Sequence, residues 1–197
     1  MKNVLIITYY WPPSGGGGVQ RVLKFCKYLP DYGWNPVVLT VKDGEFPAFD
    51  NSLEEDANDI VCTKVKGFSF YSVFKKFSGK KNVPSYQISP GNDDNLITRL
   101  ARWIRFNLII PDGRIGWYSG AIKAAKKIIN DNNIDMIFTS GPPHSVHLIG
   151  NTLAKKTGIK WVTDFRDPWV DSFYYVENPR NKIISFFDKV LPTRCTE

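Results

Sequence analysis

The sequence predicts an α/β fold in which a parallel β-sheet is flanked by helices, and three observations lead to this prediction. Residues 4–7 form a continuous apolar block, which is typical of a strand covered on both faces. Short apolar runs then alternate with segments of helical periodicity along the chain. The intervening turns are rich in Gly and Pro. Together these features indicate strands connected by helices in a parallel sheet.

The N-terminal stretch 4–21 predicts a central strand, a loop and a helix. Pro12 and Pro13 cannot extend the strand, and the four glycines at 15–18 let the backbone approach a bound group closely. Apolar side chains then recur at helical spacing at Val19, Val22, Leu23, Cys26 and Leu29. Unpaired amides at the start of this helix attract phosphate, and Arg21 adds positive charge. The competing interpretation is a flexible surface turn.

Two familiar phosphate-binding patterns do not fit the glycine run. A P-loop needs Lys followed by Ser or Thr after its last glycine, whereas Val19 and Gln20 follow Gly18. The dinucleotide pattern G-x-G-x-x-G begun at Gly15 needs a glycine where Gln20 stands. Both classes of nucleotide-binding loop are therefore disfavoured.

The next elements continue the alternation of strands and helices. Gly33 is positioned to end the first helix, and a buried strand is predicted at 36–41. A short helix is predicted at 53–57, and the alternating pattern at 60–66 predicts a third strand. Further on, the sequence predicts a helix around 121–129, a strand at 136–139, a helix at 145–156 ended by Gly158, a strand at 160–163 and a helix after Ile183.

Residues 68–107 are predicted to form a basic and aromatic subregion that protrudes from a single domain spanning 1–197. Aromatic residues mix with lysines at 68–81, a Pro- and Ser-rich loop follows at 83–95, and 96–107 reads as a basic amphipathic helix. Such a surface suits an anionic membrane or single-stranded nucleic acid. Ordinary packing on the core with solvated lysines is the alternative.

Composition limits the class of protein. The 197 residues are 43% hydrophobic, which is enough to bury a core and excludes a wholly disordered chain. The net charge of +7 favours phosphorylated ligands, nucleic acid or an anionic membrane without choosing among them. The three cysteines have no metal-binding spacing and fit a reducing cytoplasm, and neither a secretory signal nor an apolar span is evident.

Three unusual loops follow the first, fourth and fifth predicted strands, whose carboxyl ends share one edge of the sheet. They are the glycine run, SGPPH at 140–144 and DFRDPW at 164–169. His144 is a candidate hydrogen-bond donor or base. Asp164 and Asp167 flank Arg166 in an arrangement that suits a sugar or a cation; alternatively, the carboxylates pair with Arg166 and cap a helix. His147 is expected to be structural.

These segments resemble the N-terminal domain of a GT-B glycosyltransferase of the GT4-like group, which builds bacterial surface polysaccharides. The matching stretches are VLIITYYWPPSGGGGVQRVLKFCKYL, IPDGRIGWYSGAI, TSGPPHSVHLIG and KWVTDFRDPW, which cover most of the chain. The resemblance implies a Rossmann-like half that holds the acceptor, facing a second half that holds a nucleotide-sugar donor. It also implies transfer without a metal ion or cofactor and with retention at the anomeric carbon.

The resemblance also suggests roles for individual residues. Gly16, Gly17 and Gly18 with Arg21 would face the donor phosphates, and Ser140, Asp164 and Arg166 would contact the acceptor or the transferred sugar. His144 and Asp167 are the expected catalytic residues, and no metal ligands are expected.

The donor-binding half is missing from this sequence, so the fragment alone is expected to be inactive and to bind at most the acceptor. The expected partners are a nucleotide sugar held through the missing half, a glycan or lipid-linked acceptor, and an anionic membrane surface. The expected location is the cytoplasm, with peripheral contact at the inner face of the cytoplasmic membrane. Nucleic acid is not expected. Two alternatives stay open, namely a non-catalytic module that binds anionic lipid or nucleic acid, and half of a sugar-nucleotide epimerase.

Overall fold

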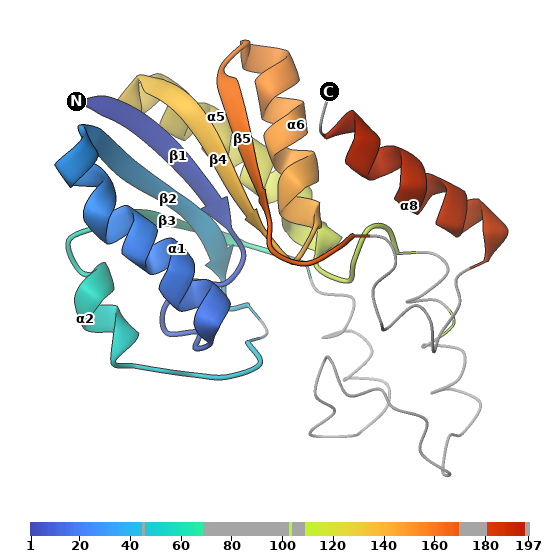
Figure 1. Ribbon diagram of the computed structural model, residues 1–197, viewed down its shortest axis with the longest axis horizontal. Helices are drawn as coiled ribbons and strands as arrows, with labels where there is room; N and C mark the ends of the chain where they lie inside the picture. The colour runs from blue at the N-terminus through green and yellow to red at the C-terminus, as the bar shows by residue number, and fades with distance from the viewer. Residues whose placement is uncertain (45, 69–102, 104–108, 170–180, 196–197) are drawn as a thin grey trace.

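The computed structural model describes residues 1–44, 46–68, 103, 109–169 and 181–195 (Figure 1). Its five strands form one parallel sheet in the order β3-β2-β1-β4-β5. The strands are β1 (Lys2–Thr8), β2 (Trp34–Lys42), β3 (Val61–Lys66), β4 (Ile134–Gly141) and β5 (Lys160–Phe165). The predicted α/β, Rossmann-like fold is thereby confirmed, and β1 is the central strand as expected.

The strand order reverses direction once. The chain steps outward from β1 to β2 and β3, then returns to the other side of β1 to add β4 and β5. In open parallel sheets, ligands bind beyond the carboxyl ends of the strands at such a reversal. This topology therefore directs attention to the loops after β1, β4 and β5.

Helices cover both faces of the sheet (Figure 1). One face carries α1 (Gly17–Tyr28) and α2 (Leu53–Ala57), and the other carries α5 (Tyr118–Asn132) and α6 (Ser145–Thr157). Short 3-10 turns, η1 (Leu29–Tyr32) and η2 (Ile115–Trp117), precede β2 and α5.

The two-sided cover explains the unbroken apolar block in β1. Val4 and Ile6 belong to the core beneath α1, whereas Leu5 and Ile7 belong to the core beneath α5 and α6. All four side chains are almost fully buried. Since successive side chains of a strand point to opposite faces, only a strand covered on both sides needs apolar residues at every position.

The observed helices follow the predicted pattern closely. Val19, Val22, Leu23 and Cys26 form the buried side of α1. Leu29 does not continue this helix, because the chain tightens into η1 with a proline at its start. Gly33 and Gly158 both adopt the left-handed conformation that ends a helical segment.

The last described helix, α8 (Lys182–Arg194), lies at one side of the molecule near α6 (Figure 1). The Asn181 side chain caps its N-terminus by accepting a hydrogen bond from the Ile184 amide at 2.9 Å. Asp188 is buried in this helix and accepts a 3.4 Å hydrogen bond from Nε1 of Trp169. A helix capable of crossing a membrane is not found among the described residues.

The prediction of a protruding subregion at 68–107 falls almost entirely outside the described residues, apart from Phe68 and Trp103. Both of these aromatic side chains are exposed. The stretches 69–81 and 83–95, together with all of 96–107 except Trp103, lie outside the described residues.

Candidate functional site

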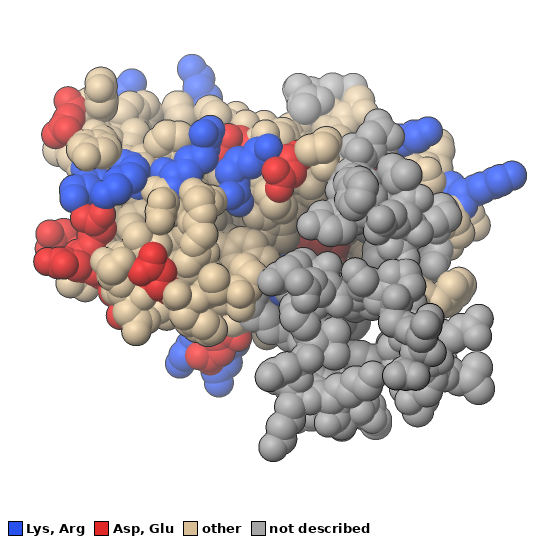
Figure 2. All heavy atoms as spheres, turned by 60° about the horizontal axis from the view of Figure 1, so that its bottom comes forward, with Lys and Arg blue, Asp and Glu red and all other residues tan. Residues whose placement is uncertain are grey.

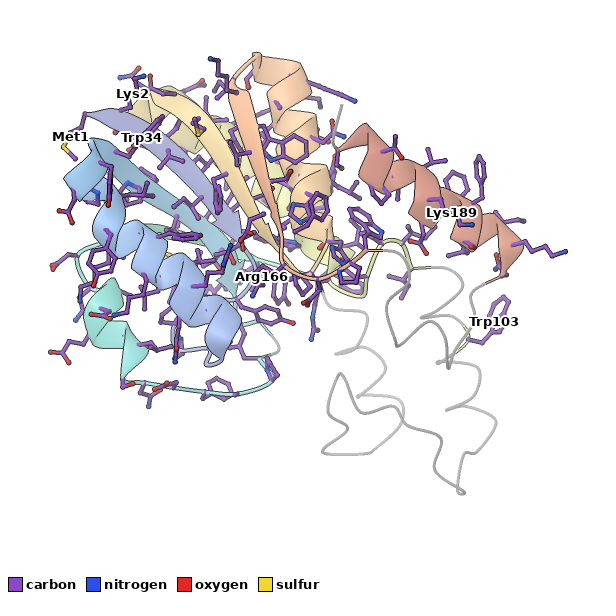
Figure 3. All side chains as sticks on the ribbon, in the orientation of Figure 1. Met1, Lys2, Trp34, Trp103, Arg166 and Lys189 are labelled. Atoms are coloured by element: carbon purple, nitrogen blue, oxygen red, sulfur yellow. The ribbon has the colours of Figure 1, made fainter. Side chains whose placement is uncertain are left out.

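An open cavity of about 370 Å³ lies at the carboxyl ends of the strands. The residues that line it are Gly17, Gly18, Arg21, Asp164, Phe165 and Arg166. Five of these six were singled out from the sequence, and they come from the start of α1, from the end of β5 and from the residue that follows β5. Figure 3 shows Arg166 between α1 and the carboxyl ends of the strands.

The glycine loop forms one wall of the cavity, where α1 begins. Gly16 precedes the helix with φ of 106°, a conformation that residues other than glycine rarely adopt. Its carbonyl accepts hydrogen bonds from the Val19 and Gln20 amides at 3.0 and 3.2 Å. Within the described residues, the Gly17 and Gly18 amides have no acceptor. These amides are the kind of donor that binds an anion at a helix start.

Gly18 is required for a different reason. A Cβ at this position would overlap Nη1 of Arg166, so the absence of a side chain lets the guanidinium pack directly against α1. Gly16 and Gly17, in contrast, have open space where a Cβ would stand. The glycines of one run therefore serve separate purposes.

Arg166 forms the opposite wall and is held by the loop after β4. Its Nε donates to the Gly141 carbonyl at 3.1 Å and its Nη2 donates to the Pro142 carbonyl at 2.9 Å. Burial lowers the pKa of Arg166, while the nearby carboxylates of Asp164 and Asp167 oppose that shift. The sequence offered a choice between a ligand role and pairing with these carboxylates, but the side-chain hydrogen bonds of Arg166 go to backbone carbonyls.

Asp164 pairs instead with Arg21, across the mouth of the cavity. Nε and Nη2 of Arg21 donate to the two carboxylate oxygens at 3.2 and 3.1 Å. The Ser140 hydroxyl donates to Oδ2 of Asp164 at 2.9 Å. The Asp164 side chain is only 14% exposed, whereas Arg21 is 51% exposed. This network joins α1, β4 and β5, and it brings Ser140 into contact with the lining.

His144 lies beneath the rim, outside the residues that line the cavity. Its ring is buried and stacks on the Trp169 indole, with centroids 4.9 Å apart and an interplanar angle of 14°. Burial lowers the pKa of His144, and the carboxylates of Asp112, Asp167 and Asp188 oppose the shift. Its Nδ1 has no hydrogen-bond partner within the described part of the chain.

Asp167, the second expected catalytic residue, is exposed and does not line the cavity. Its carboxylate is close enough to influence the pKa of both His144 and Arg166. The catalytic roles of His144 and Asp167 thus stay predictions.

His147 is embedded in the core, as the sequence suggested. Its Nδ1 lies 2.9 Å from the Thr139 hydroxyl, which also accepts a 3.0 Å hydrogen bond from Nε1 of Trp161. Burial is the main reason that the pKa of His147 falls to about 3, with the neighbouring His144 adding to the shift. A neutral His147 is therefore a fixed part of the support beneath the loop after β4.

Sequence reasoning missed two supporting residues. Asp112 accepts the Ser145 amide at 2.8 Å and so holds the start of α6. The indole ring of Trp169 stacks on the imidazole ring of His144. Asp112 sits in a Pro-Asp-Gly turn, a pattern that signals a structural Asp, but its partner 33 residues away is not indicated by any local pattern.

Charges around the site are mixed in sign. Figure 2 shows Lys and Arg side chains beside Asp and Glu side chains on this view of the molecule. Lys24 and Lys27 of α1, for example, both form ion pairs with Asp56. Among the described residues, no cluster of three or more His, Cys, Asp or Glu side chains is arranged to hold a metal ion.

Comparisons with solved structures give partial matches. MurG from Acinetobacter baumannii is 16% identical, with a TM-score of 0.45, and the match covers 83% of this chain and 34% of that chain. A glycosyltransferase from Rickettsia africae is 15% identical, with a TM-score of 0.45 and coverages of 89% and 32%. SsfS6, a glycosyltransferase of Streptomyces sp. SF2575, is 12% identical, with a TM-score of 0.44 and coverages of 83% and 39%.

This chain spans about a third of the length of these similar structures. Each TM-score is below 0.5, so the assignment of the fold rests on the strand order and not on the matches. No family model and no curated protein sequence matches the chain.

Proposed function

We propose that this chain forms the acceptor-side half of a GT-B glycosyltransferase that transfers a sugar from a nucleotide-sugar donor to a glycan or a lipid-linked acceptor. The observation that carries the proposal is the cavity in which the glycine loop and the DFRDPW segment face each other. The SGPPH segment holds two lining residues of this cavity in place. Ser140 donates a hydrogen bond to Asp164, and the carbonyls of Gly141 and Pro142 accept hydrogen bonds from Arg166.

The polar groups on the two walls of the cavity suit the phosphates of the donor and the hydroxyl groups of a sugar. Free amides at Gly17 and Gly18 are donors for phosphate oxygens. Asp164 and Ser140 provide a carboxylate and a hydroxyl of the kind that orients sugar hydroxyl groups. Arg21 stands between the two walls, and Arg166 closes the cavity.

The sequence resemblance supplies the finer points of the proposal. These are a retaining, metal-independent reaction, a role in cell-surface polysaccharide synthesis, a cytoplasmic location at the membrane, and a second half that binds the donor. His144 and Asp167 are proposed to act on the reaction from the rim.

Transfer activity of a longer protein tests the proposal. A protein that joins this chain to a donor-binding half should transfer a sugar, and Gly17→Val should lower the rate by about tenfold or more, because the side chain would enter the cavity. The position meets no protein atom within 4 Å of its Cβ, so folding is expected to survive. His144→Ala tests the rim residue in the same assay.

Gly113→Val is the matched control. Its Cβ also meets nothing within 4 Å, and Gly113 does not line the cavity. Unchanged transfer in Gly17→Val, or no transfer with any nucleotide sugar, would contradict the proposal.

A further inference from the structure

We propose that Arg166 is the residue with which this chain grips an anionic phosphoryl group in the cavity. The inference rests on the proposed function and adds a specific contact to it, since the resemblance placed Arg166 on the sugar or acceptor.

The guanidinium of Arg166 is fixed before any ligand arrives. Two of its three nitrogens donate to the carbonyls of Gly141 and Pro142, and the Arg166 amide also donates to the Gly141 carbonyl at 3.1 Å. A side chain that is already ordered loses little rotamer entropy when it binds a ligand.

The third nitrogen lies beside Gly18, at the wall of the cavity. Within the described residues, Nη1 of Arg166 has no hydrogen-bond acceptor. It packs against Gly18, and both residues line the cavity. A charged guanidinium nitrogen at this place suits a phosphoryl oxygen, because Arg forms short, charge-assisted hydrogen bonds to phosphate.

The other cation of the cavity is already engaged. Nε and Nη2 of Arg21 donate to the Asp164 carboxylate, and the Arg21 side chain is half exposed to solvent, which screens its charge. The negative charges of Asp164 and Asp167 also reduce the positive electrostatic potential around Arg166. Within the described part of the chain, however, neither carboxylate is hydrogen-bonded to Arg166. Arg166 is therefore the less exposed cation of the cavity, and it is the one whose side-chain hydrogen bonds go to backbone carbonyls rather than to a carboxylate.

Binding of inorganic pyrophosphate at low salt tests this assignment. Isothermal titration calorimetry on the 197-residue chain should show binding that Arg166→Gln weakens by about tenfold or more. The double variant Arg21→Gln/Asp164→Asn removes the ion pair without changing the net charge and should weaken binding by less than about threefold. Lys127→Gln, an exposed residue of α5, is the control for net charge and should bind like the parent chain.

Gly18→Ala provides a second test that leaves Arg166 in the sequence. The added methyl group would displace Nη1, so pyrophosphate binding should weaken, whereas Ala is favourable in a helix and the fold should persist by circular dichroism. This variant keeps the test valid if Arg166→Gln disturbs the loop after β4.

Two results would overturn the inference. One is equal pyrophosphate binding by the parent chain, Arg166→Gln and Gly18→Ala; the other is an equal loss in Lys127→Gln. Failure of the proposed function looks different, since a longer protein would then transfer no sugar while pyrophosphate binding still depended on Arg166. Sugar transfer that is insensitive to Arg166→Gln would refute this contact alone.

Discussion

At the residue scale, two buried histidines stand out because they support the site without lining its cavity. His147 is bonded to Thr139, and His144 is stacked on Trp169. Burial lowers the pKa of both, so that both are neutral in the folded protein at neutral pH. The loop between β4 and α6 therefore depends on uncharged imidazole rings.

Folding stability should fall in acid because of these rings. An unfolded His has a pKa near 6.5, whereas folded His147 has a pKa of about 3. Between these values the unfolded state binds more protons, so stability rises with pH and is lost as the pH falls from 6.5 toward 3. For His147 alone, this linkage predicts a loss of about 2 kcal/mol between pH 7.5 and pH 5.

Urea unfolding at the two pH values measures this loss in the parent chain and in His147→Gln. The variant lacks the titrating group, so its stability should change less with pH, by about 2 kcal/mol. Carboxylates that titrate in both proteins cancel in the comparison. An equal pH dependence in the two proteins would show that His147 does not contribute as described.

Individual contacts are also where the sequence is least informative. Arg21 and Asp164 were both singled out, but their pairing joins residues 143 positions apart and no local pattern indicates it. The choice between a carboxylate and a carbonyl as the partner of Arg166 depends on where the Pro-rich loop places its backbone. Such choices are made by tertiary packing, which propensity and periodicity do not encode.

At the scale of elements, the sequence is much more informative, because periodicity reflects burial directly. The apolar block 4–7 predicted a strand covered on both faces, and the spacing from Val19 to Cys26 predicted the buried side of α1. Gly158 ends α6 as predicted, whereas Gly33 ends the turn η1 and not α1. The short turn η1 was missed because its residues continue the helical spacing.

The start of α1 allows a matched test of neighbouring glycines. Gly16 has φ of 106°, so Gly16→Ala should destabilise the fold by about 1–2 kcal/mol through backbone strain. Gly17 does not have a positive φ and its Cβ meets no atom, so Gly17→Ala should stabilise by about 0.5 kcal/mol. Thermal unfolding of both variants measures the difference, and equal effects would contradict the described geometry.

At the scale of the whole molecule, the indole of Trp169 connects the segment after β5 to α8, the last described helix. Trp169 stacks on His144 and donates to the buried carboxylate of Asp188 in α8. α8 also reaches α6, where the Asn151 amide group donates to Sγ of Cys195 at 3.7 Å. The position of α8 is therefore linked to the segment that forms one wall of the cavity.

Trp169→Phe should loosen this link while keeping the aromatic stack. Loss of the hydrogen bond to buried Asp188 is expected to cost about 1–2 kcal/mol. Hydrogen exchange should become faster in α8 and stay unchanged in β1. Trp34→Phe, at the start of β2 and far from α8 in Figure 3, is the control; faster exchange in α8 from both variants would argue against a specific link.

Because the cavity joins segments that lie far apart in the sequence, its walls are synthesised at different times on the ribosome. The first wall of the cavity is translated early, but Asp164 follows Arg21 by 143 residues, a delay of roughly 7–30 s at common translation rates. During that interval, the edge of β1 that later pairs with β4 has no partner strand in the nascent chain. The lining of the cavity is therefore complete only after β5 and Arg166 have left the exit tunnel.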